Sequence, residues 1–315
     1  MAKRIPPEHN ETNGQATVAA SDRNLDGETG QRLSVLKTYK IYVGGKFPRT
    51  ESGRFYVVKS PDGRPLANAC KCSRKDVRDA IQAARGAQSG WASRSAYNKS
   101  QILYRIAEML EGRKAQFVEE LTSLGVATSA ATKEVQQAVD RLVYYAGWAD
   151  KYQQVFASVN PVNSSHFNFS LLEPTGVVTA VCPETPSLLG LVSVVAPLIV
   201  GGNSVVALAS TRDPLTAVTF GEVLATSDLP GGVVNLLTGD AADMLTTMAD
   251  HMDVNAIVYA GPDAAAATKA KTLCATNVKR PLIWRDVDWT SDDAQSPYRI
   301  LDAQEVKTTW HPVGT

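Results

Sequence analysis

Four cysteines, whose side chains could act as nucleophiles or hold a metal, occur in this chain: Cys70, Cys72, Cys182 and Cys274. A structural zinc site needs about four ligands at suitable spacing. Cys70 and Cys72 form one C-x-C pair, without a second pair or a histidine cluster nearby. We therefore predict no metal site, and we interpret Cys182 and Cys274 as buried structural thiols, a common state of free cysteine.

Two further residues invite a catalytic interpretation, but each has a simpler one. His311 lies between Trp310 and Pro312, as expected of a surface histidine in a tail. Lys307 lies in a strand pattern, where a charge protects an exposed edge from unwanted pairing. We assign neither residue a role in chemistry.

The elements that would position a ligand begin near residue 176, where short apolar strands alternate with helices. We expect strands at 177–181, 204–209, 233–237, 256–259 and 282–284, and helices at 187–200, 214–226, 242–250 and 263–276. This alternation predicts a parallel sheet covered on both faces. Ligands of such sheets bind beyond the carboxyl ends of the strands. Those ends are 182–186, 208–213, 238–243 and 260–263.

Helix N-termini at Thr185, Ala241 and Pro262 could contribute backbone N–H groups to a phosphate at this edge. The glycine doublets do not form a G-x-G-x-x-G fingerprint. From the residues alone, the prediction is therefore an α/β protein that could bind a nucleotide.

The first half of the chain has a different pattern. Residues 1–33 are polar and predict a disordered extension, since they lack apolar periodicity. Strand patterns at 39–43 and 55–58 predict a hairpin with a turn at Gly44-Gly45. Ser73 is expected to cap a helix. Further helices are expected at 97–113, 116–124 and 131–152, and a strand with one polar face at 166–171.

Composition excludes several classes of function. The chain has 315 residues, with 32 basic and 32 acidic side chains, so its charge gives no reason to expect nucleic acid or an anionic membrane as partner. The most apolar stretch, 188–200, is too short to span a membrane. The polar start lacks the apolar region of a secretory signal. We expect a cytoplasmic protein.

Two passages resemble the aldehyde dehydrogenase superfamily in order and spacing. The first runs E-P-T-G-V-V from Glu173, then Pro183, Ala196-Pro197, G-N-S-V-V from Gly202 and P-L-T-A from Pro214. The second is L-P-G-G-V-V-N-L-L-T-G from Leu229. The resemblance covers roughly residues 39–284. It implies a Rossmann-like parallel sheet with flanking helices, plus a small antiparallel oligomerisation sheet. The chain looks most similar to the non-catalytic second half of the family-16 type.

The resemblance also implies where the reaction's residues would lie. In the family a cysteine attacks the aldehyde, an asparagine helps to hold the oxyanion, and a glutamate activates water. Thr185 stands at the asparagine's position and Trp284 at the glutamate's, with Asp286 as a conceivable substitute base on the same strand face. No cysteine follows Cys274, where the nucleophile would lie. We therefore predict no catalytic residues.

The cofactor positions implied by the resemblance depart from the family's pattern as well. By position they are Pro183, Glu184, Thr185, Leu208, Thr211, Gly239, Gly261 and Pro262. Leu208 and Thr211 replace the lysine and glutamate that hold the adenosine ribose, and a leucine offers no hydrogen bond. Pro262 lacks the N–H that could meet phosphate, and we expect Asp263 to cap a helix. The resemblance therefore implies NAD or NADP as the cofactor, while these replacements argue against its binding.

The last residues resemble the family's closing oligomerisation strand. This pattern runs from Leu301 to Thr309 and follows a polar stretch, 289–297, that we interpret as a linker. The predicted organisation is an extension at 1–33, an NAD(P)-binding domain at 34–288 with oligomerisation strands at about 39–58 and 160–172, and a linker with a closing strand at 289–315. The catalytic domain is expected to be excised between them.

Three functions remain open. The first is a catalytically deficient structural or regulatory subunit, forming homo-oligomers or hetero-oligomers with a complete aldehyde dehydrogenase. The second is an NAD(P)-dependent oxidoreductase on aldehydes that takes its catalytic cysteine from a partner chain. The third is a dinucleotide sensor without turnover.

Overall fold

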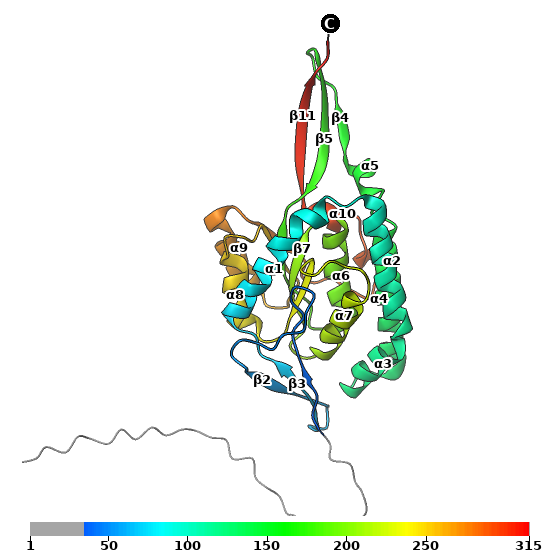
Figure 1. Cartoon of the computed structure of the whole chain (residues 1–315), viewed down its shortest axis with the longest axis vertical. Coiled ribbons are helices and arrows are strands. Elements are labelled where there is room, and N and C mark those ends of the chain that lie inside the picture. Colours follow the sequence, from blue (N-terminus) through cyan, green and yellow to red (C-terminus); the bar gives the residue numbers. More distant parts are fainter. Residues whose placement is uncertain (1–34, 315) are drawn as a thin grey trace, which may run out of the picture. The chain divides into compact units, whose positions relative to one another are not determined.

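The computed structural model describes residues 35–314, and the extension predicted at 1–33 lies outside them. The centre of the described part is a five-stranded parallel sheet in the order β10-β9-β6-β7-β8 (Figure 1). Its strands are β6 (Val177–Val181), β7 (Ser204–Leu208), β8 (Val234–Leu237), β9 (Ala256–Tyr259) and β10 (Arg280–Ile283). Every residue of β6 to β9 is buried, as apolar runs covered on both faces require. The predicted α/β fold is confirmed.

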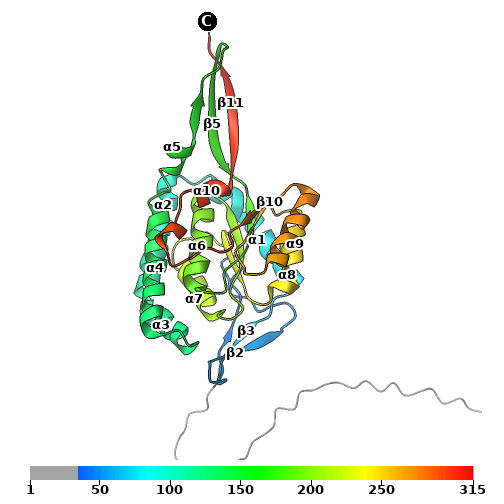
Figure 2. The ribbon, with the colours of Figure 1, turned by 180° about the vertical axis from the view of Figure 1, so that it is seen from behind.

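Helices cover both faces of this sheet (Figure 2). On one face, α1 (Arg74–Ala92), α8 (Ala241–Asp250) and α9 (Ala264–Cys274) enclose one apolar cluster with the strands. On the other face, α6 (Ser187–Val200) and α7 (Leu215–Ala225) belong to a larger cluster. An outer layer covers α6, so that all fourteen of its residues are buried, and only Ser187 and Ser193 among them are polar. That layer comprises α2 (Ala96–Gly112), α3 (Lys114–Ser123), α4 (Thr128–Ala146) and the short α5 (Tyr152–Phe156).

A second sheet lies at one end of the molecule, in the order β1-β3-β2. Its strands are β1 (Thr38–Tyr39), β2 (Phe55–Lys59) and β3 (Pro65–Cys70). The hairpin predicted at 39–58 is wrong, because β3 lies between β1 and β2 and pairs with both. The sequence gives β3 a weak strand signal, since proline, asparagine and alanine are depleted in strands.

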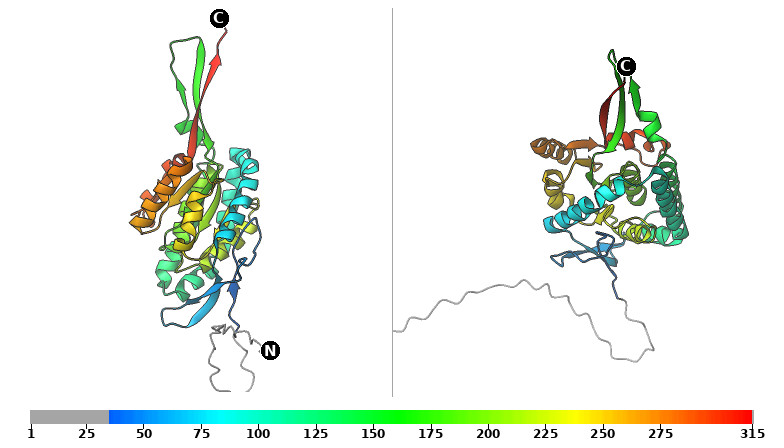
Figure 3. Two further views of the ribbon diagram at one scale, coloured as in Figure 1. Left: turned by 90° about the vertical axis from the view of Figure 1, so that its left-hand side faces the viewer. Right: turned by 45° about the horizontal axis from the view of Figure 1, so that its top comes forward.

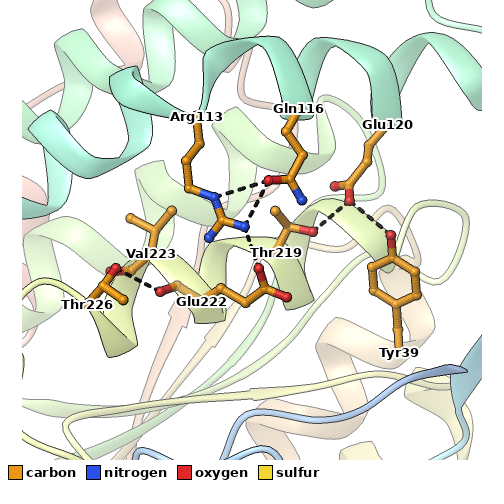
Figure 4. Close-up of polar contacts among 8 residues, drawn as sticks. All are labelled: Tyr39, Arg113, Gln116, Glu120, Thr219, Glu222, Val223 and Thr226. Carbon is orange, nitrogen blue, oxygen red and sulfur yellow. Dashed lines mark hydrogen bonds and ion pairs between the residues drawn. The ribbon is translucent and has the colours of Figure 1, made fainter. Parts of the chain in front are cut away.

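A polar cluster fastens β1 to the helices (Figure 4). Glu120 on α3 accepts hydrogen bonds at one carboxylate oxygen from Tyr39 Oη at 3.0 Å and from Thr219 Oγ1 on α7 at 2.7 Å. Arg113, nearby, binds Gln116 and forms an ion pair with Glu222. Burial raises the pKa of Glu120 and that of Tyr39. These bonds therefore stabilise a carboxyl group that burial alone would disfavour in its charged form.

A third sheet projects from the body as an arm (Figure 3). It contains β4 (Ser158–Asn160), β5 (His166–Pro174) and β11 (Gln304–Pro312), in the order β11-β5-β4. β11 pairs antiparallel with the whole of β5, so the sheet that the resemblance implied is present. It does not include the segment at 39–58, which belongs to the second sheet. The strand predicted at 301–309 begins later, because α10 (Tyr298–Asp302) precedes it.

Two further findings bear on function. Within residues 35–314, no helix is both long and apolar enough to cross a membrane. Over the same residues, no three histidine, cysteine, aspartate or glutamate side chains gather as metal ligands would.

Candidate functional site

The carboxyl ends of the parallel strands gather the predicted positions at one edge of the sheet. The loop at 182–186 follows β6, and Thr211 and Gly239 follow β7 and β8. Thr211 Oγ1 donates to the Gly239 carbonyl at 3.1 Å, and its backbone N–H donates to Glu184 at 3.0 Å. The structure therefore brings these three predicted positions into direct contact. Gly239 has a φ of +135°, a backbone conformation that favours glycine.

Other predicted positions face away from a ligand or are already engaged. Leu208 ends β7 with its side chain in the apolar core, 1% exposed, so it points away from the binding edge. Pro183 is buried against Gly190 of α6. In the loop after β9, Gly261 lies against the Tyr259 ring, and the Pro262 carbonyl accepts a hydrogen bond from Arg285 at 3.0 Å.

Glu184 fills a small cradle of hydrogen-bond donors with its own carboxylate. One oxygen accepts from Ser210 Oγ at 2.9 Å and from the backbone N–H groups of Thr211 and Arg212 at 3.0 and 3.2 Å. Backbone N–H groups converging in a loop form an anion-binding concavity. Here the anion is a side chain of the same chain, so these donors are already satisfied.

Carboxylates also occupy the three helix N-termini that were predicted to meet phosphate. Glu134, on α4, accepts from the backbone N–H groups of Leu188 and Leu189 at 2.9 and 3.3 Å, at the start of α6. Asp240 accepts from Ala242 N at 2.9 Å at the start of α8, and Asp263 from Ala265 N at 2.8 Å at the start of α9. The prediction that Asp263 caps a helix is confirmed.

These caps change the electrostatics of the edge. A helix N-terminus attracts an anion through free N–H groups and the helix dipole. Burial raises the pKa of Glu134, while its two backbone hydrogen bonds lower it. The carboxylate caps take the place at these helix ends that a phosphate would need. Pro262 offers no N–H, and Leu208 turns its side chain into the core instead of presenting a polar group, so the residues at this edge do not fit a dinucleotide.

An open cavity of about 660 Å³ lies beside Thr185 at the same edge. Thr185 is exposed there, while Glu134, Glu184 and Arg212 contribute charged side chains to the wall. Asp213, which also lines the cavity, accepts hydrogen bonds from Ser187 Oγ and from Thr216 Oγ1, the latter at 3.1 Å. Burial raises the pKa of Asp213.

The cavity holds no reactive thiol among its lining residues. All four cysteines are free and buried, as predicted for Cys182 and Cys274. Cys182 lies at the end of β6, where burial raises the pKa of its thiol well above the ordinary range. A thiolate is the attacking form of cysteine, so burial makes this thiol a poor nucleophile.

Trp284, which the resemblance places at the family's general-base position, packs as a structural residue in this chain. It is 7% exposed, and its Nε1–H donates to Asp302 Oδ2 at 3.1 Å. Asp286 does not replace the base: β10 ends at Ile283, and Asp286 has a φ of +58° and an 87% exposed side chain. The expectation that Asp286 shares a strand face with Trp284 is therefore wrong.

The segment at 284–303, which we call the strap, packs against the body where a linker was predicted. The Arg299 guanidinium lies between two indoles, 4.7 Å from the Trp284 ring and 5.0 Å from the Trp289 ring. Arg141, 2% exposed, donates to Ser193 Oγ at 2.9 Å and to strap carbonyls at 3.3 Å. The linker interpretation of 289–297 is wrong, because Trp289 and Ala294 belong to the main core.

Comparisons with known proteins agree with the fold. The sequence profile of the aldehyde dehydrogenase family matches residues 47–283. Cytosolic 10-formyltetrahydrofolate dehydrogenase of Mus musculus is 29% identical over 280 residues, covering 82% of this chain and 31% of that protein. Retinal dehydrogenase 2 of Gallus gallus is 29% identical over 251 residues, covering 78% and 48%.

Solved structures give the same result at the level of fold. An NAD+ complex of aldehyde dehydrogenase from Bacillus cereus superimposes with a TM-score of 0.75 at 20% identity, covering 79% of this chain and 51% of that one. The chain thus spans about half or less of the relatives it matches. The likeness to the family-16 second half stays a prediction. From the profile match and the shared fold together, the chain belongs to the aldehyde dehydrogenase family.

Proposed function

We propose that this chain is a catalytically deficient member of its family, which acts as a structural or regulatory subunit through its arm. The observation that carries the proposal is the set of carboxylates at the ligand edge. Glu134, Asp240 and Asp263 cap the helices, and Glu184 fills the loop after β7. With these donors used internally, the edge offers a dinucleotide little to bind.

The packing of the strap supports the same proposal. Trp284 replaces the general base and is fixed by Asp302 and Arg299. A buried indole cannot accept a proton from water. Trp289 and Ile300 of the strap also belong to the main core, so the strap covers the body next to Trp284.

The arm offers a surface that a partner could cover. Val159, Phe167, Phe169 and Leu171 lie on one face, by the strand register and by alternation. Val159, Phe167 and Leu171 are 64%, 47% and 46% exposed, and the Phe167 and Phe169 rings are 5.5 Å apart. Contiguous exposed apolar side chains mark interaction surfaces. We propose that another copy of the chain or a complete aldehyde dehydrogenase covers this apolar face.

Leu171→Glu tests the assembly role. Leu171 lies directly opposite Lys307 on β11, so the new carboxylate has a cation nearby and the arm should still fold. Burying a leucine in an interface contributes roughly 1.5–3 kcal/mol, so the variant should bind its partner about tenfold or more weakly. Native mass spectrometry of the tagged chain purified from its source cells measures the assembly.

Val143→Glu, at a 41% exposed residue of α4, is the matched control. The wild-type chain and this control should be recovered in the same complexes, and Leu171→Glu in smaller complexes that lack the partner bound at the apolar face. Equal complexes for all three proteins, or single chains throughout, would contradict the proposed role of the apolar face.

The cavity beside Thr185 favours one alternative. A partner chain could place its cysteine in this space, and the chain would then be part of an NAD(P)-dependent oxidoreductase on aldehydes. That function needs a bound cofactor at the edge where the carboxylates lie. A dinucleotide sensor needs the same binding, so both alternatives rank below the subunit.

A further inference from the structure

The outer edge of β11 is the longest unpaired strand edge of the arm, since β5 covers only its other side (Figure 1). In an antiparallel pair, every second residue exchanges hydrogen bonds with its partner, and the residues between direct theirs outward. Two backbone hydrogen bonds show which residues of β11 bond to β5. Thr175 N donates to the Ala303 carbonyl at 3.2 Å, and Val313 N donates to the Ser165 carbonyl at 3.0 Å.

Both bonds involve odd-numbered residues of the last segment, and they agree with the register in which Thr308 lies opposite Ser170. The odd-numbered residues of β11 therefore bond to β5. The even-numbered residues direct their backbone groups to the free edge. Val306, Thr308 and Trp310 are the central residues of this kind, and all three are exposed.

Each end of this free edge is closed. At one end, the Arg280 guanidinium donates to the carbonyl of Gln304 and binds the Glu305 carboxylate at 2.9 Å. At the other end, Pro312 has no N–H to donate. The open part of the edge is thus Val306 to Trp310, and Thr308 is its middle residue.

We propose that a second copy of this chain pairs with the edge, antiparallel and with its two-fold axis at Thr308. The open edge is self-complementary about this residue. Thr308 then exchanges both backbone hydrogen bonds with Thr308 of the second copy, and Val306 does the same with Trp310. All three outward residues are satisfied, and the two arms form one continuous sheet.

The side chains fit this register as well. Val306 and Trp310, 61% and 57% exposed, come to lie opposite each other as an aliphatic and aromatic pair, a favourable cross-strand combination. Glu305 faces His311, and Lys307 faces Thr309. A two-fold axis at Lys307 would instead set two lysines directly opposite, which is destabilising. An axis at Thr309 would pair Val306 with Pro312, which cannot donate.

This inference rests on the proposed assembly role of the arm, but it concerns the edge of β11 and not the apolar face. Disulfide trapping tests the register directly. In Thr308→Cys, the two new thiols lie opposite each other, with Cα atoms about 5.5 Å apart, which a disulfide can bridge. In the control Thr309→Cys, each thiol lies opposite Lys307 of the other copy. The two new thiols are therefore displaced by two residues along the strands, which is too far for a disulfide to bridge.

The native cysteines are all buried, so mild oxidation with diamide should act on the new thiols. We expect Thr308→Cys to run as a covalent dimer on non-reducing gels, and Thr309→Cys to stay largely a monomer. Equal cross-linking of both variants, or of the control alone, would overturn the register. No cross-linking of either variant would overturn self-pairing.

A second variant tests the backbone bonds. Thr308→Pro removes an outward N–H and leaves the backbone bonds to β5, whose donors are the odd-numbered residues. It also removes the side-chain hydrogen bond between Thr308 Oγ1 and Ser170 Oγ. Removing this donor costs the dimer both bonds across its axis, so its dissociation constant should rise on the order of tenfold or more. Light scattering over a dilution series measures it, and circular dichroism checks the fold.

The experiments distinguish a failure of the β11 edge proposal from a failure of the apolar-face proposal. An unchanged dimer in Thr308→Pro, with complexes still lost in Leu171→Glu, would overturn edge pairing and leave the proposed subunit function standing. A wild-type chain that stays monomeric at every concentration would overturn edge pairing as well. Loss of the dimer in Thr308→Pro alone would support the edge and leave the apolar face unsupported.

Discussion

Trp284→Glu, which places a glutamate where the resemblance puts the family's general base, yields a chain that still produces no NADH from aldehydes and unfolds more easily than the wild type. The inserted carboxylate would replace an indole that is 7% exposed and bonded to Asp302. Removing a buried tryptophan costs roughly 3 kcal/mol at the lower end of its range. Attraction to Arg299 offsets part of this cost, and repulsion from Asp302 adds to it.

Trp284→Phe is the control for this substitution. Phenylalanine keeps an aromatic ring near Arg299 but loses part of the indole's volume and the hydrogen bond to Asp302, which together should cost about 1–3 kcal/mol. Urea unfolding gives the stabilities, and absorbance at the NADH band gives activity against a panel of aldehydes. NADH formation by Trp284→Glu above the wild-type level would show that a competent site had only lost its base.

Trp289→Ala should lower the free energy of unfolding by about 3–5 kcal/mol, the range for removing a buried aromatic side chain. Trp289 is 4% exposed, and its ring packs against Arg299. Its carbonyl accepts a hydrogen bond from Arg141. The loss follows from the account of the strap as part of the core, because a linker tryptophan would contribute little.

Trp310→Ala is the matched control, since this indole is 57% exposed on the arm. Measured where both variants are monomeric, it should change stability by less than about 1 kcal/mol. A cost below about 1 kcal/mol for Trp289→Ala would mean that the strap lies loosely on the body, and that the body does not depend on it.

The sheet was the most predictable part of the fold. The limits expected for β6 and α6, 177–181 and 187–200, agree with the structure, because buried parallel strands and buried helices both appear as uninterrupted apolar runs. β3 was missed because Pro65, Asn68 and two alanines give little strand signal. The strap was misread because its polar residues outnumber Trp289 and Ala294, which nevertheless decide where it packs.

The sequence predicted which residues lie at the candidate site, but it did not predict which side chains contact one another there. Strand ends correctly gathered Glu184, Thr211 and Gly239 at one edge. Glu134, which caps α6, lies more than fifty residues earlier on another helix, so no local pattern could link it to the site. Asp263 was foreseeable as a cap because an aspartate directly before a helix is a local signal.

Isothermal titration calorimetry of the full chain with NAD+, and with NADP+ in parallel, tests the central claim most directly. The claim is that the chain's own carboxylates occupy the donors on which a dinucleotide would depend. The account predicts no saturable heat at millimolar cofactor. Saturable one-to-one binding with a dissociation constant below about 1 mM, equivalent to roughly 4 kcal/mol, would contradict it.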